Sequence, residues 1–247
     1  MSKNNSGDMK LLDHLSELRK RLTVVVVVNF VVAMILFNNA GKIMKYLLII
    51  NPGMQLVYVS PSEPLLVYIE LAFIFAIAIC SPVTLYEIWA FVEKGLTKKE
   101  KALIVISLFF GLLCFVVGVI FCYFTVLPVT LQFFQRIVIT EVESMVSIKS
   151  YASFVNMMLL SFGIVFEMPV MSYLLTKLEI LKPEFLVKNR GICIVLIFIF
   201  AAIITPPDVI SQMMLGIPMI ILLEISIMVS KVVLKLNKNK VKDESIA

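Results

Sequence analysis

One carboxylate within a long apolar stretch is the first residue of this sequence whose chemistry needs an explanation. Glu167 lies in "SFGIVFEMPV" (161 to 170), about 15 residues, or roughly 22 Å, along a predicted membrane helix. Pro169 has no backbone N–H and leaves the Val165 carbonyl unpaired, so the helix should bend there. A bare charge at this depth is costly. Glu167 is therefore either a hydrogen-bonded link between helices or a functional site, and the residues alone favour neither.

The residues needed for catalysis or metal binding are missing from the expected positions. The only histidine, His14, precedes the first apolar run, so a serine or zinc protease site at membrane depth would lack its base. No HExxH, GxSxG or P-loop pattern occurs. The cysteines lie in apolar runs without a CxxC pair, which is typical of buried small residues: Cys80, Cys114, Cys122 and Cys193. We predict no enzymatic activity, no metal and no cofactor.

The composition places the chain in a membrane. Hydrophobic residues make up 60% of the 247 positions, charged residues only 16%, and the mean hydropathy is +1.01, far from the values of a soluble domain. Long uncharged runs favour α-helices over the alternating strands of a β-barrel. The first run follows a charged start and has no small-residue cleavage site, so it should stay as a helix.

Six apolar runs predict an all-α membrane protein with six transmembrane helices. We expect one membrane domain over residues 1–230 and a disordered, basic cytoplasmic tail over 231–247. The predicted spans are 22–37, 65–91, 102–127, 152–178, 191–205 and 209–229.

Lysine and arginine fix the predicted orientation. The N-terminus, the connections near 92–101 and 177–190 and the C-terminal tail hold 18 of these residues, against 4 in the other three connections. This alternation follows the positive-inside rule and places both termini in the cytoplasm. The net charge of +5 therefore reflects topology and anionic lipid rather than nucleic acid.

Prolines mark the predicted bends and helix ends. Pro82 lies within the second span, and Pro206 and Pro207 separate the fifth and sixth helices, with Asp208 available to cap the sixth. We expect these two helices to be short and to form a tight hairpin. On the outer side, the connection 38–64 contains a turn at 51–53 and should be ordered, and we expect it to form a cap together with the long second helix.

The N-terminal segment "LLDHLSELRKRL" has leucines at helical spacing and charges mostly on the other side. It predicts an amphipathic helix along the cytoplasmic interface, with an ion pair between Glu17 and Arg21 four residues apart. Taken alone, Glu17 and Glu100 ("TKKEK") would merely neutralise neighbouring cations.

Four blocks together give the sequence a family resemblance: "HLSELRKRL" (14–22), "SPVTLYEIWAFVEKGLTKKEK" (81–101), "SFGIVFEMPV" (161–170) and "TPPDVISQMMLGIPMIILLE" (205–224). In this order and spacing they resemble TatC, the six-span receptor of the twin-arginine protein translocase. The resemblance covers nearly the whole chain. It implies a curved, cup-shaped bundle with both termini cytoplasmic, in a bacterial cell membrane.

The function implied by the resemblance is non-enzymatic. Such a receptor binds the twin-arginine signal peptides of folded cargo proteins and organises single-span TatA-type and TatB-type partners and further copies of itself. Transport is driven by the proton-motive force.

The resemblance also implies roles for individual residues. Glu17 and Glu100 would read the cargo arginines beside Phe91, while Arg19, Arg21 and nearby lysines would repel other cations. Phe91 could equally be an interface anchor. Glu167, Gln212 and Thr205 would face a concave surface and contact partner helices; the alternative for Gln212 and Thr205 is hydrogen bonding within the chain.

The competing interpretation is an ion-coupled secondary transporter that uses the intramembrane Glu167. The sequence has no visible inverted repeat and few other intramembrane polar residues to build a substrate site, which favours the receptor.

Overall fold

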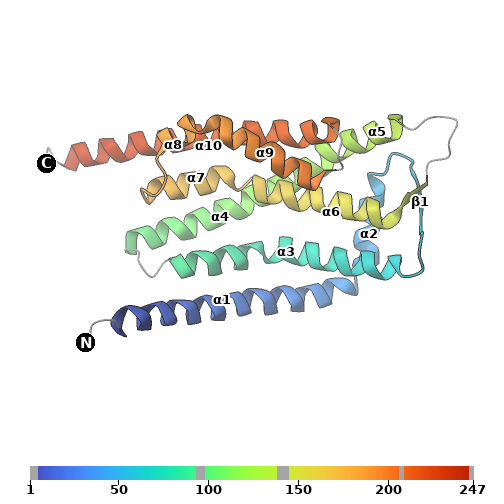
Figure 1. Ribbon diagram of the computed structural model, residues 1–247, viewed down its shortest axis with the longest axis horizontal. Helices are drawn as coiled ribbons and strands as arrows, with labels where there is room; N and C mark the ends of the chain where they lie inside the picture. The colour runs from blue at the N-terminus through green and yellow to red at the C-terminus, as the bar shows by residue number, and fades with distance from the viewer. Residues whose placement is uncertain (1–4, 93–97, 138–144, 206–208, 245–247) are drawn as a thin grey trace.

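The computed structural model describes residues 5–92, 98–137, 145–205 and 209–244, almost all of them helical (Figure 1). The elements are α1 (Asn5–Phe37), α2 (Ala40–Ile49), β1 (Gln55–Val57), α3 (Glu63–Val92), α4 (Lys98–Phe121), the π-helical segment η2 (Cys122–Val126), α5 (Leu127–Ile137), β2 (Met145–Ser147), α6 (Ile148–Val165), α7 (Met168–Lys177), α8 (Pro183–Lys188), α9 (Arg190–Ile204) and α10 (Val209–Glu244).

The predicted membrane architecture is confirmed. Five helical stretches are long and apolar enough to cross a membrane: Ser16–Phe37, Glu63–Ile88, Leu103–Ile137, Ile148–Lys177 and Ser211–Asn237. The sixth apolar helix, α9, has only 15 residues, as predicted for the fifth span. In Figure 1 both termini, the C-terminal end of α3, the N-terminal end of α4, and α8 lie at one end of the bundle, whereas α2 and β1 lie at the other.

Three expectations about helix length and direction were wrong. The sixth helix is not short, because α10 has 36 residues, and its last turns include residues 231–244, which were expected to be disordered. Lysine is a good helix former, so a tail of spaced lysines can extend a helix that the membrane has already started. The amphipathic N-terminal segment does not lie apart along the interface, because α1 continues through it into the first span without a break.

The core of the bundle forms around α6, which buries eleven residues along its length. It crosses α4 closely at two glycines. A Cβ on Gly118 would lie 2.6 Å from the Phe162 carbonyl oxygen, and one on Gly163 would lie 2.5 Å from the Phe115 ring. Small residues at such crossings let backbones approach where lipid supplies no hydrophobic driving force. The α4–α6 contact therefore depends on the absence of these two side chains.

Helix α7 packs against α10 through hydroxyl groups. The Ser172 hydroxyl donates to the Ser226 carbonyl over 2.9 Å, and Thr176 is hydrogen-bonded to Ser230. All of these side chains are buried. Interhelical hydroxyl bonds of this kind join helices whose outer faces are apolar.

The connection between α1 and α3 is ordered, as predicted for residues 38–64, and pairs with the segment before α6. Strands β1 and β2 pair in parallel, with Gln55 opposite Met145. The Asn51 side chain accepts from the Met54 N–H, and Gly53 takes a positive φ of 104° in the predicted turn. Buried Glu63 ties the two connections together, because it accepts from the Val59 N–H and from the Ser147 hydroxyl.

The close α4–α6 crossing gives a test of the fold. Gly118→Ala should lower the free energy of unfolding by about 1–3 kcal/mol, because the added methyl group meets backbone that cannot move aside easily. Gly191→Ala is the matched control, since nothing lies within 4 Å of its Cβ position. Thermal unfolding of both variants in detergent measures the difference. Equal stability of the two would contradict the crossing.

Candidate functional site

A three-residue ion cluster joins α1 to α3 at the end of the bundle that holds both termini. Arg21 donates to Glu17 from Nη2 over 2.8 Å and from Nε over 3.1 Å, as predicted for residues four apart. Its third bond was not predicted: Nη1 donates to Glu87 on α3 over 2.9 Å. The three side chains are mostly covered, with 23%, 13% and 16% of Arg21, Glu17 and Glu87 exposed. We call them the Arg21 cluster.

No function was expected of Glu87 from the sequence. The available signal was its place near the end of the second predicted span, 65–91, while Arg21 lies directly before the first, 22–37. An acid in one membrane helix and a base at matching depth in the next helix are expected to pair.

Three other residues were predicted to bind the signal peptide: Phe91, Glu100 and Arg19. Phe91 is in the last turn of α3 and Glu100 in the first turn of α4; their side chains lie outside the described residues. Arg19 is exposed on α1. The structure thus joins Glu17, Arg21 and Glu87 directly.

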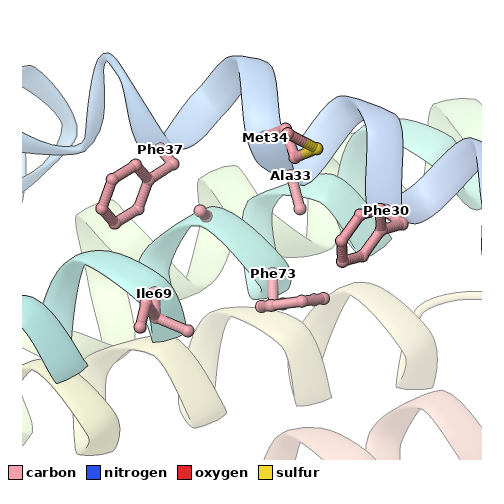
Figure 2. A pocket seen from close by; sticks show the side chains of 7 residues that line it. Phe30, Ala33, Met34, Phe37, Ile69 and Phe73 are labelled. Carbon is pink, nitrogen blue, oxygen red and sulfur yellow. The ribbon is translucent and has the colours of Figure 1, made fainter.

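An apolar groove runs between α1 and α3 (Figure 2). It is lined by Phe30, Ala33, Met34, Phe37, Ile69, Ala72 and Phe73. The rings of Phe30 and Phe73 lie 6.4 Å apart. No lining residue carries a polar side chain, so this groove cannot distinguish one charged group from another.

The membrane-depth glutamate lies at a helix break. Helix α6 ends at Val165, α7 begins at Met168, and Pro169 follows in the first turn of α7. The Glu167 N–H donates to the Ile164 carbonyl three residues back over 3.1 Å, which is a tightened turn rather than an α-helical one. The predicted bend is therefore a break between two helices.

Glu167 lines a narrow cleft between α3, α4 and α7. Ser107 lines the same cleft; its side chain is only 4% exposed, and its hydroxyl has no hydrogen-bond partner. Within the described part of the chain, no hydrogen bond or ion pair involves the Glu167 carboxylate. A half-buried acid and an unpaired hydroxyl in one cleft can accept and donate hydrogen bonds to a group from outside the chain.

Gln212 and Thr205 bond within the chain. Gln212 Nε2 donates to the Phe198 carbonyl across the hairpin over 3.0 Å. The buried Thr205 hydroxyl donates to the Ala201 carbonyl of its own helix over 2.9 Å. These contacts match the intramolecular alternative, and among the described residues neither side chain is hydrogen-bonded to Glu167.

The proline positions are only partly described. Pro82 lies inside α3, which continues through it. Pro206, Pro207 and Asp208 lie outside the described residues, so the capping role of Asp208 is untested. The hairpin is also held by an ion pair between Arg190 and Glu224, with 2.9 Å between Nη2 and Oε2. Within the described ranges, no group of three or more metal-ligating side chains gathers.

Comparison with known proteins places this geometry in a family. The model of the family described as Sec-independent protein translocase protein (TatC) matches residues 13–218. The chain belongs to the TatC family. This membership favours protein translocation over the ion-coupled transporter considered from the sequence, and makes the chain a multi-pass protein of the bacterial membrane.

Individual members of the TatC family resemble the chain over nearly its whole length. It is 36% identical to the Sec-independent protein translocase protein TatC of Carboxydothermus hydrogenoformans, covering 90% of this chain and 93% of that protein. It is 37% identical to TatCy of Bacillus subtilis, covering 94% and 92%. A crystal structure of the twin arginine translocase receptor TatC superposes with a TM-score of 0.81 at 36% identity, covering 89% of this chain and 99% of that one.

Proposed function

We propose that this chain is the receptor of a twin-arginine translocase. It binds the twin-arginine signal peptide of a folded cargo protein at its cytoplasmic face and gathers single-span Tat partners for transport driven by the proton-motive force. The observation that carries the proposal is the family match over residues 13–218, which includes both proposed signal-reading acids and the membrane-depth glutamate.

The proposed signal-peptide site lies at the end of the bundle that holds both termini. Glu17 is on α1 and Glu100 lies in the first turn of α4, and the N-terminal ends of both helices lie at this end (Figure 1). The distribution of lysine and arginine supports a cytoplasmic location for this end. Two acids within a basic surface favour an arginine-containing peptide, because a guanidinium forms paired hydrogen bonds with a carboxylate and an ammonium is only a point charge.

Glu100→Gln tests the proposed reading of arginine. The substitution keeps the size of the side chain and removes its charge, so binding of a twin-arginine peptide should weaken about 10- to 100-fold and export should stop. Insertion into the membrane should be unchanged. Export of a twin-arginine reporter and the amount of protein in the membrane fraction measure the two effects, and normal export would contradict the role of Glu100.

The second part of the proposal concerns partner helices. We infer that Glu167 contacts a polar group of a partner subunit, whereas Gln212 and Thr205, which bond within the chain, are left out of this contact. In support, Glu167 is half-buried, opens to a cleft with the unpaired Ser107 hydroxyl, and has no hydrogen-bond partner in the described chain. The cost of an acid at membrane depth is offset once a partner supplies a donor.

Glu167→Gln should therefore weaken assembly with the partner subunit by about tenfold or more while insertion continues. Co-purification of the partner from membranes measures assembly. Glu70→Gln is the matched control, because Glu70 is another acid of a membrane helix that accepts a bond from Ser153 of the same chain. If the Glu167 variant assembles and exports as the unaltered chain does, the partner role is wrong.

A further inference from the structure

The Arg21 cluster contains the same chemical contact that the proposed function assigns to cargo. A guanidinium already lies against the carboxylate of Glu17, with two N–H groups of Arg21 directed at one oxygen over 2.8 and 3.1 Å. A cargo arginine that bound Glu17 in the same way would need these positions. The receptor therefore carries its own arginine where the proposed function places the arginine of the ligand.

Glu87 provides a second carboxylate that can hold Arg21 when Arg21 leaves Glu17. Nη1 of Arg21 is already bonded to Glu87 over 2.9 Å, so a small rotation of the side chain can give up Glu17 while the bond to α3 persists. Arg21 is 23% exposed, so it can be reached from outside the bundle.

Displacement of Arg21 from Glu17 by a cargo side chain, which we call the exchange, favours arginine over lysine. An incoming arginine can replace the two bonds that Glu17 loses, because its fork of N–H donors matches that of Arg21. An incoming lysine presents a compact and strongly hydrated ammonium, which replaces the charge but not the paired geometry. A lysine would have to displace Arg21 from Glu17 without replacing both of its bonds. Glu17 with Arg21 bound therefore rejects lysine more strongly than a glutamate with no bound arginine would.

We propose that Arg21 is an internal competitor for the cargo arginine at Glu17, and that Glu87 is the positioning residue that holds Arg21 during the exchange. The proposal rests on the proposed function, in which Glu17 reads an arginine of the signal peptide. It adds a residue to that site, Glu87, and a source of selectivity that lies within the receptor.

Binding of two labelled peptides to the full chain in lipid nanodiscs tests the exchange. The peptides differ only in an Arg-Arg or a Lys-Lys pair, and the measured quantities are both affinities and their ratio. Glu87→Gln should weaken Arg-Arg binding about tenfold, because Arg21 then has Glu17 as its only carboxylate partner in the cluster. Arg21→Gln should strengthen Lys-Lys binding more than Arg-Arg binding, so the ratio should fall about tenfold.

The double variant separates positioning from direct contact. In the Arg21→Gln background, Glu87→Gln should change Arg-Arg binding less than twofold, since there is no resident arginine left to hold. Arg21→Lys provides a milder change if the glutamine variant fails to fold, and it should lower the ratio in the same direction. Glu70→Gln and Arg190→Gln serve as controls, because each removes one charge from a pair outside the cluster, and both should keep the ratio of the unaltered chain.

Each remaining outcome has a definite meaning. An unchanged ratio in both Arg21 variants overturns the competitor role, and an equal loss from Glu87→Gln with or without Arg21 overturns the positioning role. Glu17→Gln tells this failure apart from failure of the proposed function. If that variant loses Arg-Arg binding while the Arg21 and Glu87 variants change nothing, only the exchange is wrong. If it binds normally, or the unaltered chain shows no preference for Arg-Arg, the proposed function falls as well.

Discussion

The cost of leaving a charge unpaired in a medium without water constrains every acid in the membrane helices of this protein. In the described part of the chain, Glu63 and Glu70 accept hydrogen bonds from serine hydroxyls, and Glu224 pairs with Arg190. Glu17 and Glu87 share Arg21. Each of these contacts links two separate elements or supports a cluster that does so. These hydrogen bonds and ion pairs therefore help to determine which helices pack against one another.

Glu167 differs from these acids, because its carboxylate has no hydrogen bond or ion pair within the described part of the chain. It occupies a break between α6 and α7 rather than a continuous helix, and its cleft contains a second unsatisfied group, the hydroxyl of Ser107. The other acids named above are satisfied within the chain, whereas the carboxylate of Glu167 is open to a group from outside it. This contrast supports the proposed contact between Glu167 and a partner subunit.

The periodic and compositional features of the sequence were sufficient to predict the bundle. Long apolar runs gave six helices, and the alternation of lysine and arginine, 18 against 4, gave the predicted orientation. The length of α10 was missed, since helix continuation depends on a segment already nucleated in the membrane. The Glu17–Arg21 pair followed from helical spacing, whereas the partnership of Arg21 with Glu87 depends on how α1 lies against α3. Residues 66 apart carry no periodicity that could reveal it.

Site-specific crosslinking tests the central claim of arginine recognition most directly. A photoreactive residue placed beside Glu17 or Glu100, at position 18 or 101 of the full chain, in membranes, would be exposed to matched peptides that carry Arg-Arg or Lys-Lys. The account predicts strong crosslinking of the Arg-Arg peptide at both positions and at least tenfold less of the Lys-Lys peptide. Equal crosslinking of the two peptides, or none at either position, would contradict it.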